Sequence, residues 1–211
     1  MKILVAAGGP PEEWPSLSDQ YDFYVGIDRG GYHLIGRDFP LDLAVGDFDS
    51  LNESERQLVF QKAKEIKSSP AEKDDTDTQL ALAAVFQTFP EAEVLLVGAT
   101  GGRLDHLLAN IWLGVEARFA PFLHQLTMAD RQNQLTYLTA GSYEITRVPG
   151  MTYLGYCCLT PVENLTLSNS KYTLTNQQVD VPTSFASNEF LADSAQISFD
   201  SGIIAVIQSK D

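Results

Sequence analysis

The order in which strand-like and helix-like segments follow one another is the feature that most limits the fold of this chain. Over about the first 130 residues, short apolar segments rich in β-branched residues alternate with segments of helical periodicity. The candidate strands cover residues 2–8, 23–28, 41–47, 65–69, 94–99 and 126–130, and the helix-like segments cover 31–37, 54–64, 76–89 and 104–119. This alternation is typical of parallel strands joined by crossover helices. We therefore predict an α/β domain with a mostly parallel sheet over residues 1–131.

The character of the chain changes after residue 131, where helical periodicity disappears. Short segments with period-two alternation take over and are separated by turn residues. They cover residues 135–139, 143–148, 165–168, 172–174 and 197–199, the first two flanking Ala140-Gly141-Ser142. Such spacing favours an all-β sandwich or barrel. We place this second domain at residues 132–211.

Composition excludes several classes of partner. The chain carries 14 basic and 28 acidic residues, a net charge of −14, so a nucleic-acid backbone would meet a repulsive field. A phosphate ligand remains possible if divalent cations accompany it. The apolar runs are too short for a membrane span, which needs about 18 residues. The adjacent Cys157 and Cys158 make no disulfide framework, and the N-terminus lacks a signal-like pattern, so we expect a cytoplasmic protein.

Acidic residues gather where the predicted parallel strands end. Asp47 and Asp49 follow the strand at 41–47, Asp28 closes the strand before it, and Asp130 closes the last one. Open α/β sheets bind ligands at this carboxyl edge, so these side chains should share one rim. The Asp47 and Asp49 pair indicates a metal site. For Asp28 alone, a simple turn into the following helix is an equally good interpretation.

The segment Lys73-Asp74-Asp75-Thr76-Asp77-Thr78 precedes an apolar helix and has two interpretations. Asp and Thr are preferred N-caps, so capping alone explains much of it. Three acids in four residues exceed what a cap requires, however. Asp77, in the first turn, would complete the metal site of Asp47 and Asp49, and Lys73 would then contact a phosphate.

A glycine-rich loop, Gly98-Ala99-Thr100-Gly101-Gly102-Arg103-Leu104-Asp105-His106, joins a strand to a helix. Its backbone N–H groups and the helix N-terminus suit an anion. Arg103 can grip phosphate oxygens bidentately, while Asp105 binds metal or orients a hydroxyl group. A tight strand-to-helix turn would need glycine without any ligand, and the loop matches neither the dinucleotide nor the P-loop pattern. The three histidines, His33, His106 and His124, fit ordinary packing or surface roles.

Four motifs in series resemble the thiamine pyrophosphokinase family. They are Gly46-Asp47-Phe48-Asp49-Ser50, Lys73-Asp74-Asp75-Thr76-Asp77, the loop at 98–106, and Ser187-Asn188-Glu189-Phe190. The resemblance implies an α/β catalytic domain followed by a thiamine-binding and dimerisation domain in a homodimer. It implies transfer of the β,γ-pyrophosphoryl group of ATP to the hydroxyethyl oxygen of thiamine, giving AMP and thiamine diphosphate, with Mg²⁺ required.

The resemblance also implies roles for single residues. Asp47, Asp49 and Asp77 carry over as the acids for metal and catalysis, with Asp105 beside them. Phosphate and nucleotide contacts fall to Gly98, Thr100, Gly101, Gly102 and Arg103, in addition to the contact expected of Lys73 from its place beside the acids. Asp28 becomes a further acid at the substrate cleft. In the family, thiamine lies between the α/β half of one subunit and the β half of the other. There Tyr172 would stack on its pyrimidine ring, with Ser187 and Asn188 nearby.

Two departures from the family pattern fall in the second half. Phe185 stands where the family often has a serine, and Asn169-Ser170 replaces the usual Gly-Leu before Lys171-Tyr172. On residue type alone, Tyr172 is an ordinary sheet aromatic. Two alternative functions follow: a pyrophosphokinase for another hydroxymethyl heterocycle such as a pterin, and a non-catalytic nucleotide or thiamine diphosphate sensor. Measuring which substrate causes release of AMP would distinguish the two pyrophosphokinases. Tight product binding without turnover in Mg²⁺ would favour the sensor.

Overall fold

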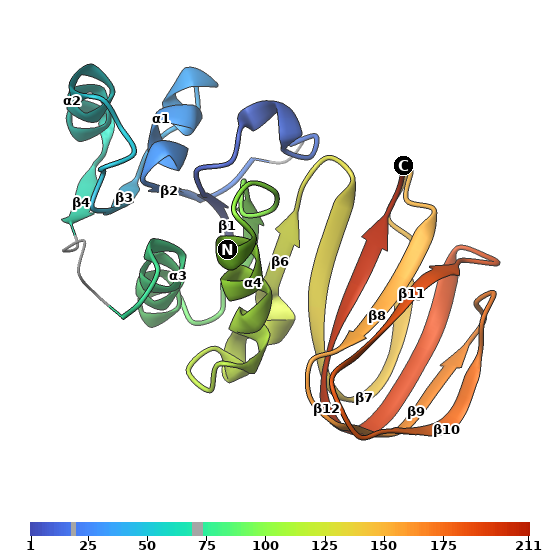
Figure 1. The fold of residues 1–211 in the computed structure, drawn as a ribbon. Helices are drawn as coiled ribbons and strands as arrows, with labels where there is room; N and C mark the ends of the chain where they lie inside the picture. Colours follow the sequence, from blue (N-terminus) through green and yellow to red (C-terminus); the bar gives the residue numbers. More distant parts are fainter. Residues whose placement is uncertain (18–19, 69–73) are drawn as a thin grey trace. The chain divides into compact units, whose positions relative to one another are not determined.

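The computed structural model describes residues 1–17, 20–68 and 74–211, which form two compact units (Figure 1). The first unit comprises Met1–Leu113 and Gln125–Arg131, and the second comprises Gly114–His124 and Gln132–Asp211. Each unit has its own core and is described by itself.

A parallel sheet forms the centre of the first unit. Its strand order is β6-β5-β1-β2-β3-β4, and each neighbouring pair is parallel. The strands are β1 (Lys2–Ala6), β2 (Phe23–Ile27), β3 (Leu43–Gly46), β4 (Glu65–Ser68), β5 (Glu93–Val97) and β6 (Leu126–Ala129). Each begins and ends within two residues of its predicted bounds, apart from Ser69, which lies outside the described residues.

Which face of the sheet each helix covers depends on the direction in which the chain moves between neighbouring strands. They are α1 (Arg29–Gly36), α2 (Glu53–Lys62), α3 (Asp77–Thr88) and α4 (Leu104–Trp112), with a short 3₁₀ turn, η1 (Pro11–Glu13), after β1. From β2 to β4 the chain moves one way, and from β4 to β6 it moves back past β1. Because such crossovers are right-handed, α1 and α2 cover one face of the sheet and α3 and α4 the other (Figure 1).

The reversal of chain direction falls between β1 and β5, which are paired neighbours in the sheet. The chain that follows β1 runs through β2 to α1 on one face of the sheet, whereas the chain that follows β5 runs directly into α4 on the other face. In open α/β sheets the crevice at such a point, beyond the carboxyl ends of the strands, is where ligands bind. The fold therefore places the candidate site at the loops that follow β1 and β5.

The second unit is built from antiparallel strands. They are β7 (Asn133–Thr146), β8 (Tyr153–Cys158), β9 (Val162–Ser168), β10 (Leu174–Val179), β11 (Thr183–Glu189) and β12 (Ser194–Ser209). The long β12 pairs with β7 on one side. On its other side it pairs with β9 through residues 196–201 and with β8 through residues 204–209, across a register shift between Phe199 and Ile203. One bent strand thus belongs to both layers.

The core of the second unit lies between these layers and explains the period-two pattern. Alternate residues of the strands are fully buried, among them Leu154, Tyr156, Leu165, Ile197 and Val206. The predicted fold class, an α/β half followed by an all-β sandwich, is confirmed.

Three details of the prediction were wrong. The helix expected at 104–119 ends at Trp112, because residues Leu113–Val115 tighten into a 3₁₀ turn in which Gly114 lies against the Tyr137 ring. The expected break at 140–142 is absent: β7 continues through Gly141, which pairs with Phe199. Tyr172 precedes β10 and lies in a turn, not in a strand.

Two further expectations concern location. Among the described residues, no helix combines the length and apolar character of a membrane span. Cys157 and Cys158 are both free thiols. The cytoplasmic location itself stays a prediction.

Candidate active site

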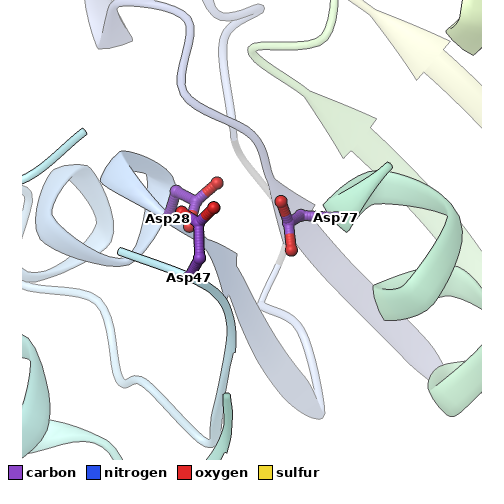
Figure 2. Close-up of side chains that lie close together, drawn as sticks. All are labelled: Asp28, Asp47 and Asp77. Carbon is purple, nitrogen blue, oxygen red and sulfur yellow. The ribbon is translucent and has the colours of Figure 1, made fainter. Parts of the chain in front are cut away.

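Three aspartates meet at the carboxyl edge of the parallel sheet. Asp28 follows β2, Asp47 follows β3 and Asp77 opens α3. One carboxylate oxygen from each lies within 4.8 Å of the other two. Figure 2 shows Asp28 and Asp47 side by side, with Asp77 facing them from the start of its helix. Residues distant in sequence thus form one acidic group, which we call the aspartate triad.

Asp28 is held in its place by the backbone around it. Its φ of 47° and ψ of −118° lie outside the usual regions for a residue with a side chain. Its N–H donates to the carbonyl of Val45 at 3.0 Å, and its Oδ1 accepts from the N–H of Phe48 at 3.0 Å. Backbone strain of this kind persists where the surrounding structure imposes it, often at functional sites.

Gly46 makes room for the Asp28 carboxylate. A Cβ atom built at Gly46 would lie 1.9 Å from Asp28 Oδ1, and the φ of +145° is one that residues with a side chain rarely adopt. Only glycine allows the carboxylate to approach the end of β3 so closely. The glycine before Asp47 is therefore part of the construction of the triad.

The electrostatics of the triad favour a bound cation. The pKa of Asp28 is raised from 3.8 to about 6, first by burial, then by the charges of Asp77, Asp47 and Asp49, against the opposing effect of the Phe48 N–H. Carboxylate oxygens are the ligands that Mg²⁺ uses in proteins, and a divalent ion would relieve this repulsion. The residues present therefore fit a magnesium ion.

Asp49 is not one of the described acids that the geometry brings together in the triad; Asp28 takes that place. The Asp49 N–H donates to Asp47 Oδ1 at 3.0 Å, which closes the turn after β3. The charge of Asp49 is near enough to raise the pKa of Asp28. Its expected role as a metal ligand stays a prediction.

Capping and site formation turn out to be divided between neighbouring residues of α3. Thr76 caps the helix: its Oγ1 accepts from the Gln79 N–H at 3.3 Å, and Gln79 Oε1 accepts from the Thr76 N–H at 2.7 Å. Because Thr76 supplies the cap, Asp77 is left to face Asp28 and Asp47, and an acid at this position is favoured by the helix N-terminus. Lys73 lies outside the described residues.

A cleft of about 620 Å³ opens beside the triad, entirely within the first unit. It is lined by the ends of β1, β2, β3 and β5 and the starts of α3 and α4. The lining residues are 7–10, 27–29, 47, 50, 75–78, 98–103, 106 and 110. They include five predicted phosphate-contacting residues, Gly98, Thr100, Gly101, Gly102 and Arg103, and also His106. Asp49, Asp105 and Asp130 are described but are not among them.

The loops after β1 and β5 are locked together at the cleft floor. The Gly9 N–H donates to the carbonyl of Gly98 at 2.9 Å, and Trp14 Nε1 donates to the carbonyl of Gly9 at 3.1 Å. A Cβ at Gly98 would lie 2.7 Å from the carbonyl oxygen of Ala7, so the contact requires glycine. Asn110 of α4, 6% exposed, donates to the carbonyl of Ala99 at 2.8 Å. The glycine-rich loop is thus rigidly attached at its start.

Arg103 and Asp105 pair with each other at the rim. The guanidinium donates from Nε and Nη2 to the two Asp105 oxygens at 3.1 and 2.5 Å, with both side chains exposed. The Arg103 hydrogen bonds hold the pKa of Asp105 down to about 2. Asp105 therefore lies beside Arg103 and outside the triad.

Two parts of the cleft escaped the sequence interpretation. The first is the segment Gly8-Gly9-Pro10, whose glycine pair directly after a strand was an available signal. The second is Arg29, next to Asp28. Its guanidinium donates to both Glu55 carboxylate oxygens at 3.2 Å and to the carbonyl of Ser50. Glu55 belongs to the capping box of α2, so two helices hold this cation at the cleft.

The predicted substrate residues of the second unit differ in exposure. Tyr172 is 58% exposed and Ser187 is exposed with a left-handed φ of 61°. Asn188 is only 3% exposed, and its side chain is bonded to the backbone of the turn that carries Tyr172. Phe185, in the expected serine position, packs partly buried against the core of this unit.

An acidic group able to hold a divalent cation, beside a glycine-rich loop at the reversal point of a parallel sheet, is typical of enzymes that transfer phosphoryl groups. The chain matches two family profiles: "Thiamin pyrophosphokinase, catalytic domain" over residues 14–122 and "Thiamin pyrophosphokinase, vitamin B1 binding domain" over residues 142–204. The first falls on the α/β part and the second on the β part.

Individual relatives agree with the profiles. Thiamine pyrophosphokinase of Bacillus subtilis (strain 168) is 32% identical over 217 residues, covering 99% of both chains. The crystal structure of a thiamin pyrophosphokinase family protein from Enterococcus faecalis is 57% identical with a TM-score of 0.97, covering both chains completely. Yeast thiamin pyrophosphokinase shares the fold alone, at 14% identity and a TM-score of 0.78 over 99% of this chain and 86% of its own.

The chain belongs to the thiamin pyrophosphokinase family. It is accordingly an enzyme that transfers the pyrophosphoryl group of ATP to the hydroxyethyl group of thiamine, giving thiamine diphosphate and AMP.

Proposed function

We propose that this reaction takes place at the aspartate triad, with the polyphosphate chain of ATP lying in the adjoining cleft. The observation that carries the proposal is the meeting of Asp28, Asp47 and Asp77 within 4.8 Å at the sheet edge where the glycine-rich loop begins. Asp28 and Asp47 follow neighbouring strands, and Asp77 approaches from the helix opposite.

We assign Mg²⁺ to the triad, with Asp49 close by as a fourth negative charge. A magnesium ion held there would supply positive charge to the phosphate oxygens. The thiamine hydroxyl oxygen forms a bond to the β-phosphorus, and the bond from that phosphorus to the oxygen it shares with the α-phosphate breaks, so that AMP leaves with that oxygen. Asp47 and Asp77 line the cleft, so their carboxylates can reach a metal ion that accompanies the phosphates. The strained backbone of Asp28 fixes the third carboxylate, so little rearrangement is needed on binding.

Backbone groups and arginines bind the phosphate oxygens in this proposal. The Gly98–Gly102 segment lines the cleft just before α4 begins, and backbone N–H groups in such a loop, together with a helix N-terminus, can bind an anion. Arg103 and Arg29 line the same cleft. Arg103 can donate two hydrogen bonds to an oxygen pair from the end of its guanidinium that Asp105 leaves open, whereas Arg29, bonded to Glu55 and Ser50, adds positive charge. Lys73 joins them as a predicted contact.

We further propose a homodimer in which Tyr172, Ser187 and the neighbouring turn meet thiamine. Exposed apolar side chains in both units support it. Leu104, Leu108 and Trp112, spaced four residues apart, form a stripe on α4, at 74%, 48% and 51% exposure. In the second unit, Tyr172 and Leu191 are also exposed. Large apolar side chains in groups mark interaction surfaces.

The direct test is incubation of the purified protein with thiamine, ATP and Mg²⁺, with separation of the products by chromatography. We expect equal amounts of AMP and thiamine diphosphate, and no AMP when thiamine or Mg²⁺ is left out. ADP as the nucleotide product would contradict the proposed position of bond cleavage. With a hydroxymethyl pterin in place of thiamine, we expect no release of AMP. Any turnover of thiamine and ATP would exclude the non-catalytic sensor.

A further inference from the structure

The turn that carries Tyr172 lies between β9 and β10 and is formed by Ser170, Lys171 and Tyr172. An aromatic side chain that is 58% exposed on a turn has little packing to fix its direction. Ring stacking needs a ring held in one orientation, because each freely rotating side chain must lose entropy on binding. The contacts beneath this turn therefore decide how well Tyr172 can bind a flat ligand.

Asn188 supplies those contacts. Its Oδ1 accepts the N–H of Tyr172 at 2.8 Å and the N–H of Glu189 at 2.9 Å. Its Nδ2 donates to the carbonyl of Tyr172 at 2.8 Å and to the hydroxyl of Ser170 at 3.2 Å. A carboxamide has two donors and two acceptor sites, and these bonds use all four. The Asn188 side chain thus grips both polar groups of the Tyr172 backbone.

A bulge in β11 turns Asn188 inward. Phe185 pairs with Tyr156 of β8, and Asn188 pairs with Leu154, so three steps on one strand match two on the other. Ser187 takes the left-handed φ of 61° at this point. Since a shift of one residue exchanges the two faces of a strand, the bulge buries Asn188 to 3% and leaves Ser187 outside.

The same strand braces the turn a second time. The Lys171 N–H donates to the carbonyl of Glu189 at 3.0 Å, and the Lys171 ammonium bonds the Glu189 carboxylate. Lys171 Nζ also lies 5.5 Å from the centre of the Tyr172 ring. Ser170 and Asn188 lie at 2% and 3% exposure, whereas the ion pair is half exposed, so the amide is the firmer attachment.

We infer that Asn188 is a positioning residue, which fixes the backbone from which the Tyr172 ring extends to stack on thiamine and does not itself bind the substrate. The inference rests on the proposed contact between Tyr172 and thiamine. It changes the role expected for Asn188 from the family motif, and it leaves Ser187 as the member of the pair that is open to a ligand.

A double-mutant cycle on the full-length enzyme tests this role. We compare the unaltered protein with Asn188→Leu, Tyr172→Ala and the double variant, measuring KM for thiamine, KM for ATP and kcat. We expect Tyr172→Ala to raise KM for thiamine about tenfold, as the loss of ring stacking does, with KM for ATP unchanged. Asn188→Leu should produce a smaller rise, and the double variant should match Tyr172→Ala alone.

Each other result overturns the inference. Rises that multiply in the double variant would make Asn188 an independent substrate ligand. A Tyr172→Ala variant with unchanged KM for thiamine would remove the contact on which positioning depends. That outcome leaves the pyrophosphokinase reaction itself standing, because the unaltered enzyme still releases AMP; only absence of AMP there would refute the proposed function.

Two controls separate positioning from loss of folding. Val162→Ala, in the buried core of the same unit, should lower stability without moving KM for thiamine. Ser170→Ala is the milder variant if Asn188→Leu does not fold, since it removes only one partner of the amide. We expect it to raise KM for thiamine by a few-fold; an unchanged KM, or a Val162→Ala variant that raises it equally, would contradict positioning.

Discussion

The aspartate triad of the first unit and the Tyr172 turn of the second unit are built on opposite principles. In the triad, Asp28 lies on a strained backbone, and burial, followed by the charges of the neighbouring acids, raises its pKa to about 6. In the turn, each polar group of the Asn188 amide has a partner and the residue is buried. The first arrangement favours a bound cation, and the second is complete before any ligand arrives.

The difference follows from what each ligand brings. A metal ion carries charge that repays electrostatic repulsion on binding, so acids that repel each other raise its affinity at the expense of stability without it. A flat organic ring brings little charge, so its site gains most from being ordered in advance.

Removing the triad acid on α3 should nearly abolish the reaction. We expect Asp77→Ala to lower kcat by about a thousandfold, since several kcal/mol of charge stabilisation are lost. The fold should persist because Thr76 retains the helix cap. Release of AMP measured by chromatography, with circular dichroism as the check on folding, decides the outcome. Asp180→Asn, an exposed acid of the second unit, serves as control; kcat within a few-fold of normal for Asp77→Ala would refute its role.

Without metal, removing a triad charge should stabilise the protein. The folded pKa of Asp28, about 6, exceeds its ordinary value of 3.8, so its protonated form favours folding. That contribution is complete below pH 4 and is lost as the pH rises through 6.

We therefore expect Asp28→Asn to be more stable than the unaltered protein at pH 7 in EDTA, by about 2 kcal/mol after allowance for solvent screening. Urea unfolding at pH 4 to 7 measures this difference, which should shrink at low pH and on addition of Mg²⁺. The asparagine Oδ1 can still accept the Phe48 N–H. A variant less stable than the unaltered protein at pH 7 would show that burial and the neighbouring acids do not disfavour the charged Asp28 carboxylate in the fold.

The two acids of the β3 turn should differ in their effect on the metal. Asp47 belongs to the triad and Asp49 does not. We expect Asp47→Asn to raise the Mg²⁺ concentration for half-maximal activity at least about tenfold, since even loss of a group that supports a ligand costs that much. Asp49→Asn should raise it by less. Titration of activity with Mg²⁺ compares the variants, and a larger effect at Asp49 would favour the original sequence interpretation.

On the other side of the comparison, the exposed brace of the Tyr172 turn should matter little. Lys171 and Glu189 form a half-exposed ion pair, and such pairs contribute less than about 1 kcal/mol. We expect Lys171→Met to change the free energy of unfolding by no more than that, and Asn188→Leu to change it by more. Thermal unfolding of both variants measures the order, and the reverse order would place the main attachment of the turn at its surface.

Strand ends could be located from local patterns, which is why the acids at 28, 47 and 77 were found in advance. The grouping of these acids could not be predicted in the same way. Whether Asp28 or Asp49 completes the triad depends on the φ of 47° at Asp28 and on the space left by Gly46. Similarly, the Gly-Gly pair at 8–9 became part of the site only through its contacts with Gly98 and Trp14.

Periodicity, strand ends and motif order are properties of the chain read in one dimension, and they were enough to predict the two fold classes, the rim on which the acids lie and the family. The packing of the folded chain fixed which acids share a centre, that Thr76 caps α3 while Asp77 faces the cleft, and that Asn188 points inward. Each of these depends on side-chain direction, which a single bulge or one strained residue reverses without leaving a pattern in the sequence.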